Sequence, residues 1–488
     1  MFIGREAELT FLETKYAETK GQLIVLYGRR RVGKTETLKE FCKGKPHFFY
    51  SCTQSTDKVQ LNRFSKQLLK ENIPARQYIS GFEDWETAFY SFLDLPYGDK
   101  KKLVVIDEFP YMCRGNSSIP SILQNLWDAE FKSSNVMIIL CGSAMSFVEH
   151  ELLAEKNPLY GRATGIYKMK EMSFYDAMRF FPNYSARDKV ITYAVLGGIP
   201  HYLGQWNPEL SVDENIRKYI LTRGCALYSE VEFLLHQELR ETPIYNSVIE
   251  AVALGNTRLN EISQKSLIED SSKTSVYLKN LIELGIVEKE FSVDTRLKKK
   301  ANSSRGFYRL TDNFFRFWYT FGFSNISELE DGDVDGVYEY AVKPMLHEFA
   351  SLSFEDVCRA FVRELQRDQA LPFRYSRMGR WMGKTTVRNS SAPTGISISE
   401  TEIDILAVSR DAKEYLIGEC KFKSHPFAFS EYLDTTAKLA PLKENARFTY
   451  ALFSESGFDK KLTEEAKKGD LLLFPLETIV NYKNSVLS

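Results

Sequence analysis

The stretch Gly28-Arg29-Arg30-Arg31-Val32-Gly33-Lys34-Thr35 decides the fold of the first part of this 488-residue chain. It fits the pattern G-x4-G-K-[ST] of a phosphate-binding loop, or P-loop. Its glycines let the backbone curl so that N–H groups point inward at phosphate oxygens, and the following helix adds its positive end. We expect Lys34 to neutralise the β- and γ-phosphates, with a catalytic role, and Thr35 to bind Mg²⁺. The residues expected to contact the nucleotide here are Gly28, Arg29, Arg31, Val32, Gly33, Lys34, Thr35 and Glu36.

Three apolar runs frame this loop: residues 22–27 directly before it, residues 102–106 and residues 135–140. Continuous apolar runs separated by helical patterns predict a parallel sheet covered on both faces. Asp107 and Glu108 end the second run, where Asp107 would hold Mg²⁺ through water and Glu108 would polarise the attacking water. Near the end of the third run, Ser143 is expected to touch the γ-phosphate or its water. The alternatives are a solvated strand end and a simple turn serine.

Composition narrows the class of protein. Apolar residues make up 43% and charged residues 26%, which is a globular mix. Lys and Arg number 64 against 65 Asp and Glu, so any nucleic acid must bind to local basic patches. We expect no membrane span and no signal peptide, because no apolar run approaches the ~20 residues of a membrane helix. The seven cysteines stand singly, which indicates reduced thiols, a cytoplasmic location and no zinc site.

The length predicts roughly three domains, and the patterns along the chain divide it into four parts with a linker. We expect a P-loop core over residues 1–170, a helical lid over 171–235, a smaller module over 236–325 and a mixed α/β domain over 337–488. The acidic, glycine-containing residues 326–336 predict the linker. The fold class is therefore multidomain α/β, with a parallel P-loop sheet in the first part.

Residues 1–235 resemble AAA+/STAND P-loop ATPases of the archaeal-ATPase family. Besides the P-loop and the strand ending in Asp107-Glu108, the matching pieces are Phe2-Ile3-Gly4-Arg5-Glu6, Gly142-Ser143, Tyr160-Gly161-Arg162 and Gly198-Ile199-Pro200. The resemblance implies that ATP is hydrolysed with Mg²⁺ and that Pro200 senses which nucleotide is bound. Arg162 would sense the γ-phosphate. A tight turn at the start of a helix and an exposed loop arginine are the alternatives for Pro200 and Arg162.

Residues 257–310 resemble a winged helix-turn-helix. A short helix from about 257, a helix over 271–284 and strands over 286–293 and 306–310 follow one another. The loop between the strands is basic, and a recognition helix with a basic wing is a DNA-binding design. A structural spacer is the alternative, and the aromatic residues around Trp318 are expected in the core. The basic residues of the loop are Arg296, Lys298, Lys299, Lys300 and Arg305.

The last domain holds a second set of charged residues, on two predicted strands over 402–409 and 414–422. If residue 409 pairs with residue 414, Asp404 lies opposite Glu419 and on the same face as Lys421. Two adjacent carboxylates repel each other unless a cation lies between them, and their oxygens suit Mg²⁺ or Mn²⁺. Lys421 would steady an attacking water or the developing charge on a phosphate.

Asp404, Glu419 and Lys421 resemble the D…(D/E)-x-K signature of the restriction-endonuclease-like, or PD-(D/E)XK, nucleases, and Glu355 matches their upstream helical glutamate. The resemblance implies a restriction-endonuclease-like α/β domain in which all four residues are catalytic and Asp404 and Glu419 bind the metal. Residues 379–383 also resemble the domain that accompanies archaeal-type ATPases, although Met382 departs from its double tryptophan. A degenerate binding domain or a salt-bridged hairpin is the alternative. Arg374, Arg377, Arg380, Lys384 and Arg388 would track a phosphate backbone, or form a solvated loop.

These patterns predict an ATP-binding, ATP-hydrolysing switch, coupled through the lid and the winged helix to a metal-dependent, nuclease-like domain that acts on nucleic acid, with DNA favoured. The expected cofactors are ATP and Mg²⁺, with Mn²⁺ also suited to the C-terminal site. A homo-oligomer is compatible with the sequence, and a membrane partner is not expected. Two alternatives remain open: an ATP-dependent DNA-binding or signalling regulator with an inactive nuclease-like domain, and an ATPase that acts on a protein partner. The residues alone do not separate ATP from GTP.

Overall fold

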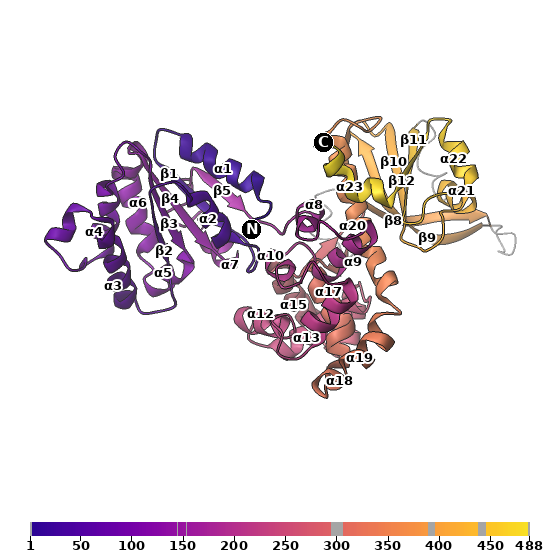
Figure 1. Ribbon diagram of the computed structural model, residues 1–488, viewed down its shortest axis with the longest axis horizontal. Coiled ribbons are helices and arrows are strands. Elements are labelled where there is room, and N and C mark those ends of the chain that lie inside the picture. Colours follow the sequence, from indigo (N-terminus) through magenta and orange to yellow (C-terminus); the bar gives the residue numbers. More distant parts are fainter. Residues whose placement is uncertain are drawn as a thin grey trace. The chain divides into compact units, whose positions relative to one another are not determined.

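The computed structural model describes residues 2–143, 145–152, 154–293, 306–388, 396–437 and 446–486. The chain forms two compact units (Figure 1). The first unit holds residues 1–172 and 199–201, and the second holds residues 173–198 and residues 202–488. Ile199, Pro200 and His201 therefore belong to the first unit, although the chain on either side of them belongs to the second.

A five-stranded parallel sheet is the centre of the first unit. Its strand order is β2-β3-β4-β1-β5, so that β4 lies between the strand before the P-loop and the strand that ends in Asp107. Every residue of β1 and β4 is buried, as the continuous apolar runs predict. The strands are β1 (Gln22–Tyr27), β2 (His47–Ser51), β3 (Lys102–Asp107), β4 (Val136–Gly142) and β5 (Gly165–Lys168).

Helices pack on this sheet around an aromatic core. The ring of Phe64 meets the rings of Phe48, Tyr50, Trp85 and Phe89 at centroid separations between 4.9 and 5.7 Å. Large rings bury much apolar surface, so this cluster stabilises the side of the sheet near β2. The helices are α1 (Glu6–Ala17), α2 (Lys34–Cys42), α3 (Asp57–Leu68), α4 (Trp85–Tyr90), α5 (Phe109–Gly115), α6 (Ile119–Ala129) and α7 (Met145–Phe147).

The second unit begins with the helices of the expected lid. Helix α9 packs against α17, α20 and α23, which come much later in the sequence. Tyr175 donates its hydroxyl proton to the carbonyl of Ile479 at 2.9 Å, and Arg187 pairs with Glu455 at 3.2 Å. Helices α8 and α9 therefore belong to one body with the C-terminal residues. The helices of this region are α8 (Phe174–Ala177), α9 (Ala186–Leu196), α10 (Pro200–Leu203), whose first two residues belong to the first unit, α11 (Val212–Asn215) and α12 (Glu230–Glu238).

Three helices and a two-stranded antiparallel sheet follow, in the order expected for a winged helix: α13 (Thr242–Ala253), α14 (Leu259–Lys265), α15 (Ser271–Glu283), β6 (Val287–Glu290) and β7 (Phe307–Leu310). The basic residues of the loop between β6 and β7 lie outside the described residues. The aromatic residues after β7 are buried and belong to the core, as expected: Phe314, Phe315, Phe317, Trp318, Tyr319 and Phe321.

Residues 326–336 differ from the linker that their composition predicts. They contain α18 (Ile326–Glu330) and α19 (Val334–Gly336), and Leu329 is buried. Arg217 from the preceding helical region forms ion pairs with Asp335 and with Glu339 just beyond the segment. The acidic residues that suggest a solvated linker instead fix this segment to a neighbouring helix.

A second five-stranded sheet, of order β12-β11-β10-β9-β8, forms the last domain with the long helix α20 (Leu346–Arg367). The pairs β8–β9 and β9–β10 are antiparallel, and β10, β11 and β12 are parallel. The remaining elements are β8 (Tyr375–Arg388), β9 (Ile396–Ser409), β10 (Glu414–Lys421), α21 (Phe429–Ala437), β11 (Arg447–Ser454), α22 (Lys460–Ala466), β12 (Leu471–Pro475) and α23 (Leu476–Val486). The mixed α/β fold class is confirmed.

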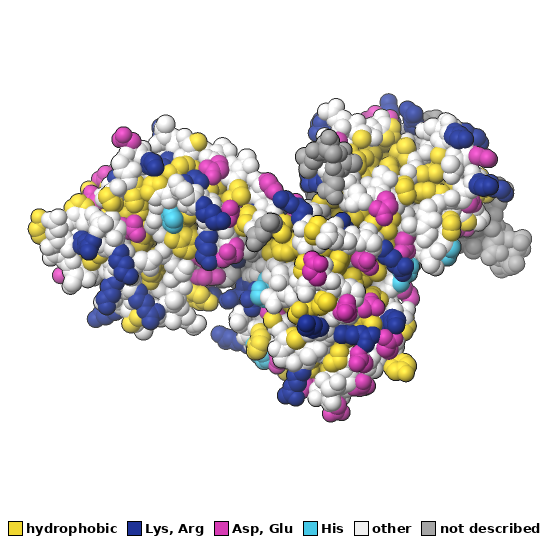
Figure 2. Space-filling model, viewed as in Figure 1, with side chains coloured by type: hydrophobic (Ala, Val, Ile, Leu, Met, Phe, Trp, Pro, Cys, Tyr) yellow, Lys and Arg dark blue, Asp and Glu magenta, His cyan; other side chains and the backbone are white. Residues whose placement is uncertain are grey.

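The surface carries both signs of charge. On the face drawn in Figure 2, Lys and Arg side chains are interspersed with Asp and Glu side chains on both units. This mixture agrees with the net charge of -1. Among the described residues, no helix combines the length and the apolar character that crossing a bilayer requires.

Candidate functional site

The P-loop connects β1 to α2, and close packing explains its glycines. A Cβ atom built on Gly28 would lie 2.3 Å from the carbonyl oxygen of Met169, so no larger residue fits there. Gly33 has φ +88° at the start of α2, in the left-handed region that glycine tolerates best. The loop therefore holds the N-terminus of α2 at its centre, where backbone N–H groups and the helix dipole favour a phosphate.

Lys34 lies at the centre of this loop and is buried. Its ammonium group donates hydrogen bonds to the carbonyl oxygens of Gly28, at 2.8 Å, and Arg29, at 2.9 Å. Burial lowers the pKa of Lys34, against the opposing charges of Glu108 and Asp107. These two carbonyl oxygens are the hydrogen-bond partners of Lys34 among the described residues, and a buried cation held in this way is well suited to an incoming polyanion.

The ends of β3 and β4 bring the other expected residues to the same edge. Thr35 donates its hydroxyl proton to Asp107 at 2.7 Å, which places two oxygen ligands of the kind that Mg²⁺ prefers beside the loop. Ser143 donates to the carboxylate of Glu108 at 3.0 Å. Glu108 has φ +51°, a strained conformation for a residue with a side chain. The structure thus brings together Lys34, Thr35, Asp107, Glu108 and Ser143, as the sequence predicts.

Arg5 is a further residue of this site, and the sequence alone predicts no role for it. It is buried, and its guanidinium donates to the carbonyl oxygens of Val32 at 2.6 Å and Lys170 at 2.8 Å and pairs with Glu8 at 2.8 Å. It therefore ties the P-loop backbone to the N-terminal helix and to the end of β5. The signal was present in the stretch Gly4-Arg5-Glu6, but its contact with the loop is not visible in sequence.

The side chain of Glu36 faces away from the loop. It is exposed on α2 and pairs with Lys39 at 2.7 Å, so only its backbone is placed for a phosphate. This corrects any expectation of a side-chain contact. Arg31 has φ +71° in the loop, and Val32 is buried.

The charged residues of the C-terminal domain lie on the hairpin of β9 and β10. The observed register pairs Val408 with Tyr415 and Ile405 with Gly418, which is the register predicted from the turn length. Asp404 and Glu419 are the next residues along these strands. Asp404 accepts a hydrogen bond from the backbone N–H of Cys420 at 2.8 Å, and Lys421 pairs with Glu419 at 2.5 Å.

The environment of Asp404 is that of a crowded carboxylate. Burial raises its pKa to about 7, and the charges of Glu355 and Glu419 add to this effect. Burial likewise raises the pKa of Glu355, although Arg380 and Arg359 oppose it. A cation would hold the Asp404 and Glu355 carboxylates in their charged form, and carboxylate oxygens such as those of Asp404, Glu355 and Glu419 are ligands that Mg²⁺ and Mn²⁺ prefer.

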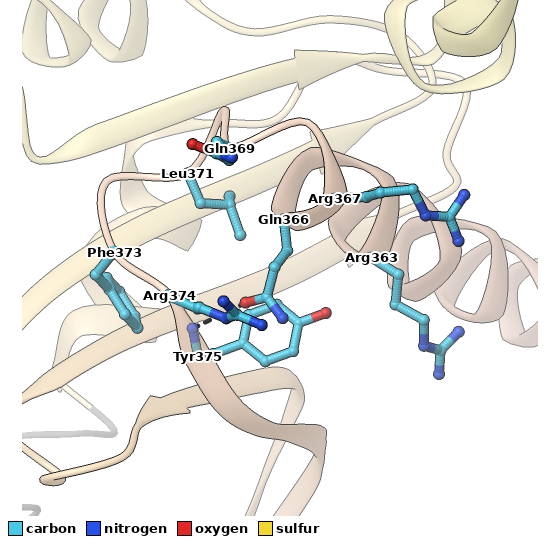
Figure 3. Close-up of a pocket in the computed structure, with 8 residues that line it drawn as sticks. All are labelled: Arg363, Gln366, Arg367, Gln369, Leu371, Phe373, Arg374 and Tyr375. Carbon is cyan, nitrogen blue, oxygen red and sulfur yellow. Dashed lines mark hydrogen bonds between the residues drawn. The ribbon is translucent and has the colours of Figure 1, made fainter.

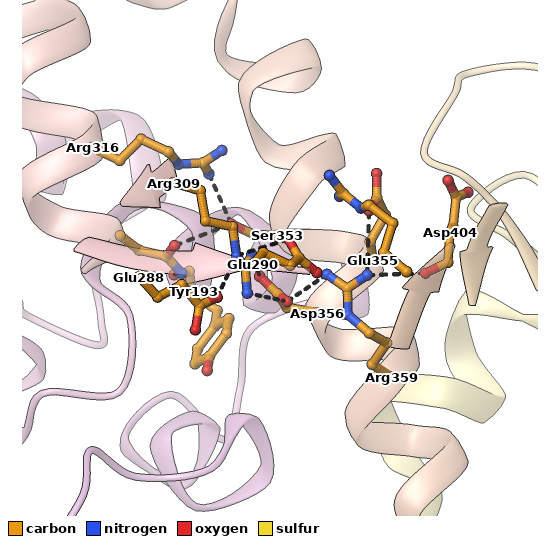
Figure 4. A network of polar contacts seen from close by, with 12 residues as sticks. Tyr193, Glu288, Glu290, Arg309, Arg316, Ser353, Glu355, Asp356, Arg359 and Asp404 are labelled. Atoms are coloured by element: carbon orange, nitrogen blue, oxygen red, sulfur yellow. Dashed lines mark hydrogen bonds and ion pairs between the residues drawn. The ribbon is translucent and has the colours of Figure 1, made fainter. Parts of the chain in front are cut away.

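A network of ion pairs surrounds Glu355 (Figure 4). Arg380 forms an ion pair with Glu355 and pairs with Glu402 at 2.9 Å. Arg359 lies 3.5 Å from Glu355 and donates to the backbone carbonyl of Asp404 at 3.0 Å. Arg380 is therefore a partner of the carboxylates, which corrects the expectation that it tracks a phosphate backbone.

The same network reaches the two-stranded sheet of β6 and β7. Asp356 accepts from Arg359 at 2.6 Å and from Arg309 at 3.0 Å. Arg309, on β7, also pairs with Glu288 at 2.5 Å and Glu290 at 3.4 Å on β6. The sheet expected to carry the wing is thus joined by charge to the helix that carries Glu355.

Within the described part of the chain, no three His, Cys, Asp or Glu side chains converge as a ready-made metal cage. Arg374 and Arg377 are exposed on the surface, as a phosphate-tracking role requires. The side chains of Lys384 and Arg388, like the loop residues Arg296, Lys298, Lys299, Lys300 and Arg305, lie outside the description.

A known protein is similar to this chain over almost its whole length. Uncharacterized protein MJECL04 of Methanocaldococcus jannaschii is 31% identical over 481 residues, which cover 98% of this chain and 99% of that protein. The model of an ATPase domain found predominantly in Archaea matches residues 2–206. The chain belongs to the archaeal-type ATPase family.

Three further similarities concern parts of this archaeal-type ATPase. A model of archaeal and bacterial proteins of unknown function matches residues 318–433. Uncharacterized ATP-binding protein MJ0423 of M. jannaschii is 58% identical over 45 residues, which are 9% of this chain and 76% of that protein. The Walker-type ATPase PABY2304 of Pyrococcus abyssi is 20% identical, and the match covers 65% of this chain and 96% of that chain with a TM-score of 0.47. The family supports an ATP-binding ATPase function for the first unit.

In the archaeal-type ATPase, Arg162 lies away from the P-loop of its own chain. Arg162 pairs with Asp128 at 2.7 Å and donates to the carbonyl of Pro158 at 2.9 Å. It precedes β5, whose first residue pairs with Ile24 near the start of β1. Because the P-loop follows the other end of β1, Arg162 lies at the opposite edge of the parallel sheet, and a γ-phosphate contact within the same chain is wrong.

Pro200 lies beside the P-loop. A Cβ atom built on Gly33 would be 3.7 Å from Cγ of Pro200, which is ordinary van der Waals contact. Burial and, secondly, the charge of Arg31 lower the pKa of the neighbouring His201. The tripeptide of residues 199–201 therefore packs on the loop that is expected to hold the phosphates.

Proposed function

We propose that this protein is an ATP-hydrolysing switch that controls a metal-dependent, nuclease-like domain acting on nucleic acid, with DNA favoured. The observation that carries the proposal is the hairpin register, which sets Asp404 beside Glu419 and Lys421 in a chain that also holds an ATPase domain. We place this activity in the cytoplasm, since all the cysteines of the described residues are free thiols.

For ATP hydrolysis, the P-loop N–H groups and Lys34 would hold the β- and γ-phosphates, and Thr35 with Asp107 would hold Mg²⁺. The ion supplies charge neutralisation at the phosphates. Glu108 would accept a proton from the attacking water, and Ser143, bonded to the Glu108 carboxylate, would orient that base. Arg5 would keep the loop in its phosphate-binding shape through the carbonyl of Val32.

For strand cleavage, Asp404 and Glu419, with Glu355, would hold Mg²⁺ or Mn²⁺, which supplies Lewis-acid polarisation of the scissile phosphate. Lys421, already paired with Glu419, would position the attacking water and stabilise the charge that develops on the phosphate oxygens. Arg380 and Arg359 would set the orientation of Glu355.

The coupling between the two activities is proposed to run through residues 199–201. Pro200 packs beside Gly33, while the chain on either side of this tripeptide belongs to the second unit. Gly197, at φ +64° and ψ -150°, has a conformation that only glycine adopts readily, so it is suited to act as a hinge. ATP binding would shift the equilibrium between two positions of this tripeptide only if the protein binds ATP more tightly in one of them.

The test uses the purified full-length protein with ATP and Mg²⁺ or Mn²⁺ and labelled single-stranded, duplex and branched DNA and RNA. We expect metal-dependent cutting that Lys421→Ala abolishes. Lys423→Ala is the matched control, because Lys423 is nearby but pairs with Glu431 at 2.8 Å. If no substrate is cut, and Lys421→Ala behaves as the wild type, the nuclease proposal fails.

A second candidate is an ATP-dependent DNA-binding or signalling regulator with an inactive nuclease-like domain. The ion pair of Glu355 with Arg380 favours it, because that arginine already neutralises a carboxylate that a metal would need. This candidate predicts DNA affinity that survives Asp404→Ala, and no cleavage under any metal condition. A homo-oligomer is compatible with either candidate.

A further inference from the structure

A pocket of about 810 Å³ lies at the C-terminal end of α20 (Figure 3). Its lining comes from the last turns of the helix, the connecting loop and the first residue of β8. It lies in the same domain as the carboxylates of the hairpin but is formed by different residues. They are Arg363, Gln366, Arg367, Gln369, Leu371, Phe373, Arg374 and Tyr375.

The lining is cationic, with three arginines and no carboxylate. Arg367 pairs with Glu364 at 2.6 Å. In the part of the chain that the structure describes, Arg363 and Arg374 have no carboxylate partner. Arginines near the end of a helix are favoured by its dipole, but Arg374 lies beyond the helix, so the dipole does not account for it. Two exposed guanidiniums at one pocket suit a phosphate group.

The rest of the lining is aromatic and amide in character. Phe373 and Tyr375 are half-buried, so part of each ring remains accessible. The side-chain oxygen of Gln366 accepts a hydrogen bond from the backbone N–H of Tyr375 at 2.9 Å, which fixes the amide and leaves its N–H₂ group to donate. Flat rings, a fixed amide and arginines are the groups with which proteins hold single nucleotides of a strand.

The pocket lies a short distance from Glu355 along α20 and from Asp404 along β9. Arg363 follows Glu355 by eight residues on α20, which is about 12 Å at 1.5 Å per residue. Tyr375 pairs with Ser409, which follows Asp404 by five residues on β9, about 17 Å at 3.3 Å per residue.

We propose that this pocket binds one nucleoside phosphate unit of a nucleic-acid strand, with the phosphate between Arg363 and Arg374 and the base against Phe373 and Tyr375. The inference rests on the proposed function, since a strand anchored here is within reach of Asp404. A free nucleotide has the same chemistry and is distinguished by the test. An acidic peptide would meet the arginines but would leave the rings without a flat partner.

The test measures binding of a fluorescein-labelled, 5′-phosphorylated oligothymidylate to the full-length protein by fluorescence anisotropy, in EDTA so that no strand is cut. The double variant Arg363→Gln/Arg374→Gln should bind about tenfold more weakly or worse, and the salt slope should fall by about 0.7 for the one lost phosphate contact. Arg363→Lys/Arg374→Lys should recover the slope. Phe373→Ala should weaken binding about tenfold without changing the slope.

Arg447→Gln is the matched control, because Arg447 is an exposed arginine at the start of β11 in the same domain, and its affinity should equal that of the wild type. An unchanged affinity in the double variant, or an equal loss in the control, overturns the inference. Displacement of the strand by polyglutamate but not by thymidine 5′-monophosphate also overturns it.

A third outcome is that the wild type binds thymidine 5′-monophosphate, the double variant does not, and the oligonucleotide does not bind at all. The pocket then binds a free nucleotide, and the proposal of a nucleic-acid strand is wrong. If the strand binds through the pocket but the wild type does not cut it, the proposed nuclease function is wrong and the pocket proposal stands. If the strand is cut and the pocket variant cuts it equally well, the pocket proposal is wrong and the nuclease function stands.

Discussion

Replacing Asp356 by asparagine tests the ion-pair network that joins β7 to α20. The asparagine side chain would keep the shape of the aspartate but lose the charge that lies 2.6 Å from Arg359 and 3.0 Å from Arg309. Breaking a fully buried pair costs about 3–5 kcal/mol and an exposed pair about 0–1 kcal/mol. The side chain of Asp356 is 31% exposed and that of Arg359 5%, and Arg359 keeps its contact with Glu355. We therefore expect a local loss of about 2–3 kcal/mol.

Hydrogen exchange of the amides of α20 measures this loss without assuming that the whole chain unfolds in one step. A change of about 2–3 kcal/mol lowers protection by about 30- to 150-fold. Glu348→Gln is the matched control, because it removes one negative charge from an exposed position of the same helix. The amides of α6, in the other unit, should not change. If Asp356→Asn affects α20 no more than Glu348→Gln does, the network does not stabilise the helix.

The same variant has a definite pH dependence. Burial would raise the pKa of Asp356, but the charges of Arg359 and Arg309 outweigh it and hold the pKa well below its usual range. A carboxyl with a depressed pKa stabilises the folded state above its unfolded pKa, about 3.9, and the stabilisation is lost as the pH falls below that value. The difference between wild type and Asp356→Asn should therefore be constant from neutral pH down to about 5 and shrink in more acidic solution.

Three further predictions concern other sites. Glu108→Gln should retain the ATP affinity of the wild type in calorimetry but hydrolyse ATP about 10²- to 10⁴-fold more slowly. If the affinity for ATP falls as much as the rate of hydrolysis, Glu108 does not act as the base. Arg162→Ala should leave the ATPase rate of the protein unchanged, because Arg162 pairs with Asp128 at the opposite edge of the sheet; a large fall in rate would restore it to the nucleotide site. In EDTA, Asp404→Asn should raise the midpoint of thermal unfolding at pH 8 and not at pH 4. The pKa of Asp404 in the folded state, about 7, exceeds that of the unfolded chain, so ionisation costs stability as the pH rises between the two. An equal gain at both pH values would mean that the buried charge is not the cause.

Local patterns in the sequence predict the local geometry of both regions. The P-loop motif directly follows a continuous apolar run, and the two together occupy residues 22–35, so the positions of Lys34 and Thr35 at the start of α2 follow from the sequence. The register of the hairpin follows from the length of its turn, and this placed Asp404 beside Glu419. In each case the geometry is set by residues close together in the chain.

The errors arose where the position of a side chain depends on distant partners. Arg162 has the sequence neighbours of a phosphate sensor, but its position relative to the P-loop is set by the direction in which β5 enters the sheet. Arg380 lies in a basic stretch, yet tertiary contacts give it two carboxylate partners. The hydrogen bond from Arg5 to the carbonyl oxygen of Val32 likewise joins the N-terminal residues to the P-loop, which only the fold brings together.

The packing of α9 has a consequence for how the protein is made. This helix is synthesised directly after the first unit, which has all five of its strands by residue 168. It packs against α17, α20 and α23, and α23 begins only at residue 476. On the ribosome, the sheet of the first unit can therefore form early, while α9 gains the last of these partners only when almost the whole remaining chain has emerged. A chaperone that shields this helix during translation would raise the yield of the second unit more than that of the first.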